Sequence, residues 1–501
     1  MPDSTRDLGP GLAGIDLGSN SFHMVVARVI QGQVHVVDRL RDRVQLATGL
    51  DARRELTPDA MQRAVVCLER FGQRLRDLPG TNVRAVGTNT LRQAKNARAF
   101  IERAEQALGH TIEIISGREE ARLIYLGVAH DLSDSGGRRL VVDIGGGSTE
   151  VIIGERFEPL STDSLYMGCV NYSLRYFPDG KLRREDFRQA EIAARVELQP
   201  IERSYRTSGW DHAIGSSGTI VAIEQIMRAN EWGDTITHRG LKRLKKALLA
   251  AENVGNLSLP GLPPDRATVL PGGVAILQAI FEAFGIESMT AATGALREGL
   301  LYDLLGRFRH EDVRDQTIRH FEQTYHVDRD QAARVERTAL DFHEQIAGPW
   351  ELDDENSRQC LKWAARLHEV GLSIAHNGYH KHGAYIIEHA DMSGFSREDQ
   401  LLLALLVRSH RRKFSREELR RLPAARLKTA IRLAALLRLA VCLNRDRGGT
   451  AIPSIVLRAR GSSVDIAFPP RHFEESPLTR ADLDEEVARF DQAGLALQLH
   501  S

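Results

Sequence analysis

The chain is poor in cysteine and carries no excess of either charge. Its four cysteines lie far apart and form no Cys-x-x-Cys pair, which argues against a zinc ribbon and against a disulfide scaffold. We expect them to be reduced thiols of a cytosolic protein. Lysine plus arginine number 67 and aspartate plus glutamate number 67, so the formal net charge is zero. No overall basic field attracts a polyanion, and any polyanion site must be local.

Long hydrophobic runs are also absent. The most apolar segment, Ala430–Leu443, is interrupted by Arg432 and Arg438 and is too short to cross a bilayer. The first residues, Met1–Asp7, carry acids ahead of a short apolar strand, which is not the basic-then-apolar pattern of a signal peptide. We therefore predict a cytoplasmic protein. Peripheral association with the inner membrane face is the alternative, although no amphipathic anchor is identified.

The segment Leu140–Gly154 carries the strongest functional signal. Val141–Val142 and Val151–Ile153 are short, β-branched and apolar, which predicts two buried strands joined as a hairpin. Successive glycines at its tip let the backbone approach an anion, and turn amides that point one way form a donor site for phosphate. Asp143 at the strand end can hold a magnesium ion against those oxygens. The other candidate residues of this turn are Gly145, Gly146 and Gly147, which supply amides, Ser148, which adds a hydroxyl, and Glu150, which adds a second carboxylate.

Residues 14–21 repeat this pattern. They read Gly-Ile-Asp-Leu-Gly-Ser-Asn-Ser, again a strand, an acid, a glycine and hydroxyls. Two such turns predict two similar α/β lobes, each presenting a phosphate loop to a shared cleft, rather than one hairpin with solvated acids. Neither turn is a Walker A loop, and Glu150 stands where a dinucleotide fingerprint needs its last glycine. The candidate phosphate-binding residues of this turn are Asp16, Gly18, Ser19 and Asn20.

A third small-residue turn, Gly215–Thr219, follows a short apolar strand and opens a helix. A helix N-terminus behind such a turn is a natural anion site. Ser217 and Gly218 are its candidate phosphate contacts, and a plain strand-to-helix turn is the alternative.

Two glutamates follow the predicted strand Thr111–Ile115. Ser116 and Glu119 form a capping-box pattern, so we expect Glu119 to be a helix-start residue that reaches back to the chain. Glu120 has no such local role and sits just beyond the end of a strand, where ligands bind in open α/β sheets. The alternative for Glu120 is an ordinary acid that is favoured near a helix N-terminus.

From Arg307 onward the composition changes to long amphipathic helices, which predicts a separate helical domain. A β-hairpin about Gly461 and a last helix at Ala481–Phe490 then predict a small α/β cap. The predicted domains are lobe I at 1–128, lobe II at 129–305, the helical domain at 306–450 and the cap at 451–501.

The helical domain is rich in histidine near its middle, with His368, His376, His380 and His382. His368 is followed directly by Glu369, but adjacent helical residues point about 100° apart and cannot alone form a metal site. We therefore favour polar helix packing, or contact with an anionic ligand, over metal binding.

A basic segment runs from Arg408 to Lys428, with nine lysines and arginines against two glutamates. Such a segment is either a solvated helix surface or the lining of a channel for a long polyphosphate or nucleic acid strand. Aromatic residues that could stack bases are scarce in it, which argues against binding of single-stranded nucleic acid.

Together these motifs strongly resemble the exopolyphosphatase and guanosine pentaphosphate phosphohydrolase family, within the sugar kinase, heat-shock protein and actin superfold. The resemblance rests on Asp16–His23, Gly87–Arg92, Ile115–Arg122, Asp143–Glu150, Gly215–Thr219 and Gly294–Gly299. Three further segments look more like the exopolyphosphatase branch, namely Arg307–Arg314, Tyr379–Tyr385 and Arg408–Arg411. The resemblance implies duplicated actin-like (ribonuclease H-like) lobes with an interlobe cleft, an all-α His-Asp-domain-like domain, a small α/β cap and a homodimer. Glu369 departs from the His-Asp pair, which puts metal chemistry in the helical domain in doubt.

The resemblance also implies roles for individual residues. Glu120 matches the family's proposed base, which orients and deprotonates the attacking water, and Arg92 supplies positive charge to the phosphate. Mg²⁺ is expected near Asp143 and Glu150, with K⁺ as an activator. The basic segment is expected to hold the rest of a long substrate, through Arg408, His410, Arg411, Arg412 and Lys413 together with His380 and His382.

We favour an exopolyphosphatase, which releases orthophosphate processively from the ends of inorganic polyphosphate. The nearest alternative is the hydrolysis of the 5′-terminal phosphate of guanosine pentaphosphate (pppGpp), which yields ppGpp by the same chemistry. A kinase would need an adenosine pocket and a second substrate motif, which the sequence does not show. A non-catalytic polyphosphate-binding regulator would lack the acids that Glu120, Asp143 and Glu150 provide. We expect no nucleic acid partner.

Overall fold

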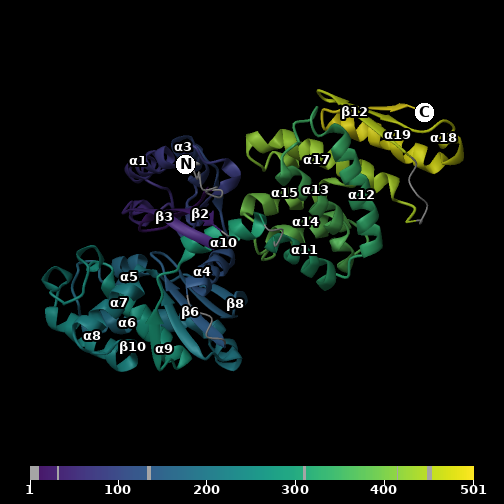
Figure 1. Cartoon of the computed structure of the whole chain (residues 1–501). Coiled ribbons are helices and arrows are strands. Elements are labelled where there is room, and N and C mark those ends of the chain that lie inside the picture. Colours follow the sequence, from purple (N-terminus) through teal and green to yellow (C-terminus); the bar gives the residue numbers. More distant parts are fainter. Residues whose placement is uncertain are drawn as a thin grey trace, which may run out of the picture. The chain divides into compact units, whose positions relative to one another are not determined.

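The computed structural model describes residues 11–30, 33–131, 137–308, 312–414, 416–447 and 454–500. Met1–Asp7, part of the segment Arg307–Arg314 and the expected boundary between residues 450 and 451 lie outside these ranges. The chain divides into two compact units, Met1–Glu311 and Asp312–Ser501, which are described separately below (Figure 1). Within the described ranges, no helix is both long enough and apolar enough to cross a membrane.

The first lobe of the N-terminal unit is built on a five-stranded sheet of order β3-β2-β1-β4-β5. Strands β1, β2 and β3 form an antiparallel meander, and β4 and β5 continue the sheet in parallel with β1. Its strands are β1 (Gly11–Leu17), β2 (Phe22–Ile30), β3 (Gln33–Asp42), β4 (Val83–Gly87) and β5 (Ile112–Ile114). Its helices are α1 (Pro58–Leu75), α2 (Asn89–Gln93) and α3 (Ala97–Leu108), with short 3₁₀ turns η1 (Leu46–Gly49) and η2 (Gly80–Asn82).

Amphipathic helices form because their apolar residues fall on one face, and α1 shows this plainly. Thr57 caps its first turn by accepting a hydrogen bond from the Ala60 amide at 3.4 Å, and Pro58 occupies the first helical position, where no N–H is needed. The buried face of α1, which includes Leu68 and Phe71, packs with strand residues such as Ile15 into one apolar core. This packing fixes the sheet from which the first turn, after β1, projects.

The second lobe repeats the first. Its sheet has the order β10-β11-β9-β6-β7-β8, in which the antiparallel meander β6-β7-β8 and the parallel strands β9 and β11 match β1-β2-β3, β4 and β5. The strands are β6 (Arg138–Ile144), β7 (Thr149–Glu155), β8 (Glu158–Leu165), β9 (His212–Ser216), β10 (Ile236–Thr237) and β11 (Ser288–Ala291). The helices are α5 (Cys169–Tyr176), α6 (Arg184–Ser208), α7 (Ser217–Ala229), α8 (His238–Ala251) and α9 (Leu270–Phe284), with η3 (Val254–Asn256) and η4 (Pro264–Arg266). The predicted duplication of actin-like lobes is therefore confirmed, as is the hairpin at β6-β7.

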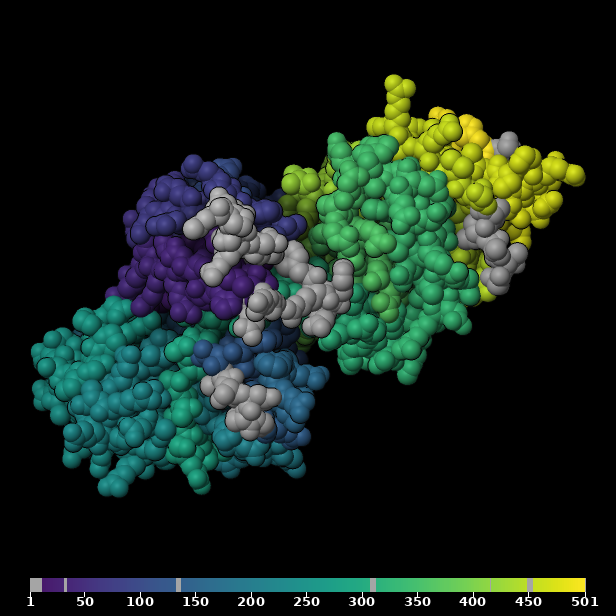
Figure 2. All heavy atoms as spheres, in the orientation of Figure 1, coloured from purple at the N-terminus to yellow at the C-terminus, as the bar shows by residue number. Residues whose placement is uncertain are grey.

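Two helices join the lobes. Helix α4 (Gly117–Asp131) packs on β7 and β8 of the second sheet, whereas α10 (Leu296–Phe308) packs on β1 and β2 of the first. The two helices contact each other closely, because a Cβ atom at Gly127 would lie 2.1 Å from the Ala295 carbonyl oxygen and one at Gly299 would lie 1.8 Å from that of Leu123. In the space-filling view the first lobe, in purple and blue, adjoins the second, in teal (Figure 2).

The C-terminal unit is mainly helical, as predicted, and ends in a small sheet of order β12-β13-β14. The larger helices are α11 (Val313–Thr324), α12 (Arg329–Ile346), α13 (Glu355–Leu367), α14 (Tyr379–His389), α15 (Arg397–Ser409), α17 (Ala424–Leu443) and α19 (Pro477–Gln492). The short elements are η5 (Val370–Ser373), α16 (Arg416–Leu419), α18 (His472–Glu475), β12 (Val456–Arg460), β13 (Ser463–Ala467) and β14 (Ala496–His500). Helices and sheet share one apolar core around Trp350 and Trp363, so the cap packs as part of this unit.

Candidate active site

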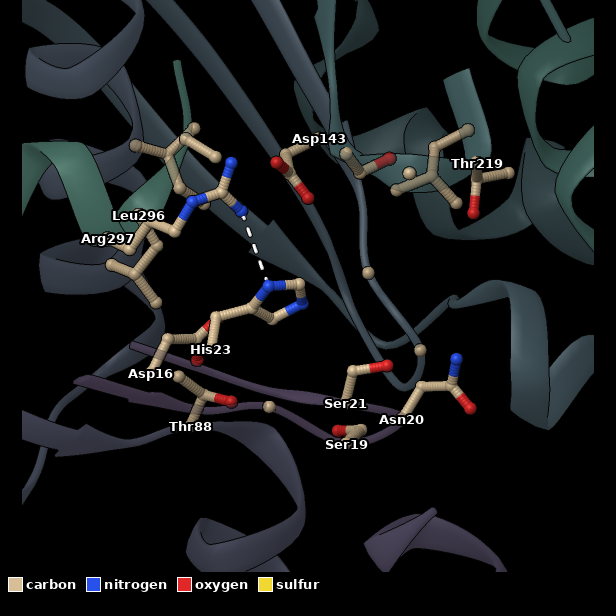
Figure 3. Close-up of a pocket in the computed structure, with 18 of the residues that line it drawn as sticks. Asp16, Ser19, Asn20, Ser21, His23, Thr88, Asp143, Thr219, Leu296 and Arg297 are labelled. Carbon is tan, nitrogen blue, oxygen red and sulfur yellow. Dashed lines mark hydrogen bonds between the residues drawn. The ribbon is translucent and has the colours of Figure 1, made fainter. Parts of the chain in front are cut away.

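The two repeated turns meet at one cavity of about 460 Å³ in the N-terminal unit (Figure 3). Asp16, Ser19 and Asn20 reach it from the first lobe, and Asp143 reaches it from the second. The predicted residues that line the cavity are Asp16, Gly18, Ser19, Asn20, Glu120, Asp143, Gly145, Gly146, Ser148, Ser217 and Gly218. The structure thus brings together three turns that are far apart in the sequence.

The glycine turn after β6 is held from behind by helix α5. The Cys169 amide donates to the Gly145 carbonyl at 2.9 Å, and the Val170 amide donates to the Gly146 carbonyl at 2.9 Å. Because C=O and N–H point in opposite directions across a trans peptide, the next amide N–H groups point away from α5. The turn therefore presents backbone donors, which is the arrangement that anion sites use.

The turn after β1 is held in the same manner. The carbonyls of Ser19 and Asn20 accept hydrogen bonds from the amides of Ala47, at 2.9 Å, and Gln45, at 2.8 Å. The Ser19 hydroxyl itself accepts from the Thr90 hydroxyl at 2.8 Å. Two equivalent turns with fixed carbonyls thus face one cavity.

Four buried polar atoms around this cavity have no hydrogen-bond partner within the described part of the chain. They are Asp16 Oδ1, Ser21 Oγ, Ser217 Oγ and Thr219 Oγ1. Ser217, at the start of α7, also has a left-handed backbone with φ of 81°, a conformation that few non-glycine residues adopt. Buried polar groups are normally satisfied, so this set indicates a ligand rich in oxygen atoms.

Three carboxyl groups here are harder to ionise than usual. Burial raises the pKa of Asp143 to about 6, with a further contribution from the negative charge of Glu120. Burial, then the charges of Glu120 and Asp143, raise the pKa of Glu150, which lies opposite Asp143 in the β6-β7 register. The pKa of Asp16 is also raised, first by burial and then by Glu120. Carboxylates that are buried close together repel one another, so a bound cation would stabilise their charged forms.

Magnesium fits this donor set. Within the described residues, no group of three His, Cys, Asp or Glu side chains is preformed to hold a metal ion. Mg²⁺ does not require one, because it usually binds through one or two carboxylates together with water and substrate phosphate oxygens. The unpaired Asp16 Oδ1 and the Asp143 carboxylate supply hard oxygen atoms of the kind that Mg²⁺ prefers.

Glu120, on the first turn of α4, is paired with Arg92 at the end of α2. Arg92 Nη1 lies 2.6 Å from Glu120 Oε2 and also donates to the Ile115 carbonyl at 3.2 Å. Of these two side chains, only Glu120 lines the cavity. Glu150 lies behind the lining, where its carboxylate accepts from the Ser164 hydroxyl at 2.7 Å. Gly147 is also behind it, packed against Asn89.

Sequence reasoning did not identify the basic residues of the cavity. Arg39, Arg41, Arg266 and Arg297 line it, together with His23. Arg297 Nη1 lies 3.4 Å from His23 Nδ1 (Figure 3), and burial, followed by the charge of Arg297, lowers the pKa of His23 to about 3. The available signal was the i, i+2 spacing of Arg39 and Arg41, which places both side chains on one face of β3.

The basic segment of the C-terminal unit lines a second cavity, of about 730 Å³. Five of the predicted channel residues border it, namely His380, Arg408, Arg411, Arg412 and Lys413. The other two do not. His410 is buried, with Nδ1 2.5 Å from the Val407 carbonyl and its ring 5.4 Å from that of His368, and His382 is not part of the lining. His410 was expected in the channel, but its ring lies against those of His368 and Tyr379, so it packs between helices instead.

Comparisons with known proteins agree with this architecture. The profile of the Ppx/GppA phosphatase family matches residues 25–308, and that of Ppx/GppA phosphatase domain III matches residues 313–487. A relative from Vibrio vulnificus, named guanosine-5′-triphosphate,3′-diphosphate pyrophosphatase, is 42% identical over 495 residues, which cover 98% of each chain. A relative of the same name from Aeromonas hydrophila is 42% identical over 492 residues, covering 98% of this chain and 99% of its own. The crystal structure of an exopolyphosphatase from Cytophaga hutchinsonii is 26% identical with a TM-score of 0.52, and covers 59% of this chain and 97% of its own.

A family match along most of the chain, two actin-like lobes and a cavity lined by acids and by the repeated glycine turns are one consistent set of observations. The chain therefore belongs to the Ppx/GppA phosphatase family, whose members hydrolyse phosphoanhydride bonds.

Proposed function

We propose that this protein removes the 5′-terminal phosphate of guanosine 5′-triphosphate 3′-diphosphate. The observation that carries this proposal is the match, over 98% of the chain, to relatives named for that activity. It reverses the order favoured by the sequence motifs, which placed inorganic polyphosphate first and this nucleotide second.

The charged residues that line the cavity support a nucleotide that carries phosphates at two separate positions. Asp143 and the glycine turn lie on one side, where a metal-bound triphosphate end would sit. Arg41 and Arg266 lie on the lining as well, where Arg41 is paired with Asp265 at 2.8 Å, and guanidinium groups of this kind bind phosphate oxygens. A substrate phosphorylated at both its 5′ and 3′ positions offers anionic groups to the glycine turn and to these arginines.

The proposed chemistry is in-line transfer of the terminal phosphoryl group to water, for which positioning and charge neutralisation are the main requirements. Glu120 accepts the proton of the attacking water. Arg92, which is paired with Glu120 and does not line the cavity in this structure, donates to the phosphoryl oxygens once it exchanges that pair for the substrate. Amides of the glycine turn and the hydroxyls of Ser19 and Ser148 hold the outgoing phosphate. Mg²⁺, held by Asp143 with Asp16 close by and Glu150 behind, would neutralise charge on the phosphate oxygens.

Exopolyphosphatase activity is the second candidate. The cavity of the C-terminal unit favours it, because six lysines and arginines border it against two glutamates and a long polyanion needs such a surface. The six are Lys381, Arg408, Arg411, Arg412, Lys413 and Arg421.

The deciding experiment measures phosphate release from pppGpp, long-chain polyphosphate and ATP at matched concentrations of terminal phosphate, with Mg²⁺ and with or without K⁺. Fast release from pppGpp with slow release from the polymer supports the proposal. Fast release from the polymer alone assigns the protein to the second candidate and leaves the mechanism in place. A K⁺ effect tests the expected activation in the same assay.

We also propose that the protein acts as a homodimer in the cytoplasm, with peripheral contact at the inner membrane face as the alternative. Light scattering on the protein as it elutes from a size-exclusion column tests the oligomeric state, and the expected mass is twice that of the chain. Cell fractionation tests the second.

A further inference from the structure

We infer that a buried ring of two arginines and two acids, formed by Arg84, Glu119, Arg122 and Asp303, positions Glu120 for the reaction. This inference rests on the role proposed above for Glu120. None of the four side chains lines the cavity, so they act through the helix turn that carries Glu120 rather than on the substrate.

Each guanidinium of the ring contacts both carboxylates, and that of Arg84 also contacts Glu113 Oε2 of β5, at 3.3 Å from Nε and 3.2 Å from Nη2. Arg122 Nε lies 2.7 Å from Glu119 Oε2, and Arg122 Nη2 lies 2.5 Å from Asp303 Oδ1. Arg84 Nη1 lies 2.6 Å from Asp303 Oδ2, and Arg84 Nη2 lies 3.4 Å from Glu119 Oε1. All four side chains are between 1% and 9% exposed, so water does not screen these contacts.

The ring joins three elements at the junction of the lobes. Arg84 comes from β4 of the first sheet, Glu119 and Arg122 come from α4, and Asp303 comes from α10. Farther along α4, Gly127 packs closely against the carbonyl of Ala295, the residue just before α10. The first turn of α4 is therefore held to both neighbouring elements by charge and farther along by packing.

Helix geometry connects this ring to the site. Adjacent residues on a helix point about 100° apart, so a side chain fixed at Glu119 sets the direction of its neighbour Glu120. The first turn of a helix is the part that frays most easily, and here the Ser116 hydroxyl and carbonyl accept from the amides of Glu119, at 3.1 Å, and Glu120, at 2.9 Å. The ring adds side-chain anchors to these two backbone bonds.

Stability alone does not explain four buried charges. Apolar residues of similar size commonly replace buried ion groups without loss of stability, and the best-attested use of such groups is to fix one register among alternatives. The register fixed here is that of the turn that presents Glu120 to the cavity and to Arg92.

A double-mutant cycle between Glu119→Gln and Glu120→Gln tests the inference on the full-length protein, with whichever of pppGpp or polyphosphate the unmodified enzyme hydrolyses faster. If Glu119 acts through Glu120, Glu119→Gln lowers kcat roughly 10-fold or more when Glu120 is present, and less than about 2-fold in the Glu120→Gln background, with KM little changed. The inference is overturned if Glu119→Gln lowers kcat by the same factor in both backgrounds, or if it does not lower kcat when Glu120 is present. A full kcat in Glu120→Gln alone removes Glu120 from the mechanism, which is a separate and visible failure.

Two further variants separate positioning from folding. Glu322→Gln is the matched control, since Glu322 is likewise buried and pairs with both Arg366 Nε, at 2.7 Å, and Arg366 Nη2, at 2.5 Å, in the C-terminal unit. It should lower thermal stability without lowering kcat. Asp303→Asn weakens the ring from α10, and hydrogen exchange at the Glu120 amide reports its effect even at low activity. Faster exchange there supports the inference, and unchanged exchange with unchanged kcat contradicts it.

Discussion

The guanidinium of Arg92 lies 2.6 Å from the carboxylate of Glu120, so the side chain proposed to bind the phosphoryl group is paired with the side chain proposed to take the proton. Both are about one-tenth exposed, and Glu120 is the one of the two that lines the cavity. A substrate phosphate that reaches Arg92 competes with Glu120 for the same donors. Binding of the substrate would thereby release the base at the moment when it is needed.

Glu120→Gln keeps the size of the side chain and removes its ability to accept a proton. We expect kcat to fall by roughly 10²-fold or more, because general-base catalysis contributes factors of that order. Substrate binding should be retained and not weakened, since the neutral amide competes less than the carboxylate with the phosphate for Arg92. Single-turnover phosphate release and equilibrium binding of the substrate measure the two quantities.

Glu191→Gln serves as the control for this variant, since Glu191 forms an ion pair with Lys245 at 2.5 Å and lies outside the cavity lining. Its turnover should equal that of the unmodified protein. If Glu120→Gln retains turnover close to that of Glu191→Gln, another residue activates the water.

Arg92→Lys and Arg92→Ala separate the effect of the positive charge of Arg92 from that of its planar hydrogen-bonding geometry in the pair with Glu120. Lysine keeps the charge but cannot bond Glu120 and the Ile115 carbonyl as a planar guanidinium does. We expect a loss of kcat for Arg92→Lys and a larger loss, on the order of 10²-fold or more, for Arg92→Ala, which also leaves the Glu120 carboxylate without its partner. Equal activity of Arg92→Ala and the unmodified protein in steady-state assays would exclude a catalytic role for Arg92.

The parts of this site that the sequence predicts are those encoded locally. Asp16 and Asp143 each follow a buried apolar strand and precede glycine and hydroxyl residues, so both turns could be identified from a few neighbouring positions. The duplicated sheets follow from the same repeat. Backbone turns of this kind depend on residues that are adjacent in the chain, and sequence reasoning handles them well.

The parts of the site that the sequence does not predict depend on contacts with residues far away in the chain. Glu119 matches a capping box, and Ser116 does cap it, but the carboxylate of Glu119 is bound by Arg84 and Arg122. His410 stands in a basic run, yet its ring, just beyond the end of α15, is buried against that of His368. Neither the burial of a single polar side chain nor its distant ion partner can be read from neighbouring residues alone.

Gly147→Ala tests the rigid support of the glycine turn. A Cβ atom at residue 147 would lie 2.7 Å from Asn89 Oδ1, and Asn89 is buried and bonded to Gln93 Nε2 at 2.8 Å. The turn must therefore shift, and we expect kcat/KM to fall by roughly 10-fold or more, since small displacements of positioning groups have effects of that size. Steady-state kinetics measure the loss, and Gly80→Ala, where a Cβ atom would meet nothing within 4 Å, is the control that should leave activity unchanged. Normal activity of Gly147→Ala would show that the turn tolerates displacement.

The buried histidines of the C-terminal unit predict loss of stability in acid. Burial, ahead of the nearby charge of Arg447, lowers the pKa of His368 from 6.5 to about 4, and burial lowers that of His380 to about 4 as well. Between those values the unfolded chain binds protons that the folded chain does not, so stability that is fully present above pH 6.5 is lost as the pH falls toward 4. For His368 alone the loss is about 2 kcal/mol at pH 5, because each pKa unit of difference corresponds to about 1.4 kcal/mol.

Urea unfolding of the full-length protein at pH 7.5 and pH 5, followed by the fluorescence of tryptophans such as Trp350 and Trp363 in the C-terminal core, measures this loss. His368→Gln cannot take up a proton in this range, so its transition should shift less between the two pH values than that of the unmodified protein. His389→Gln is the matched control, because His389 is exposed and bonds a backbone carbonyl in the same way, with Nδ1 2.9 Å from the Tyr385 oxygen. The control should keep the full acid shift. If His368→Gln keeps it too, the acid sensitivity of this unit arises elsewhere, and the packing of His368 against His410 contributes nothing to it.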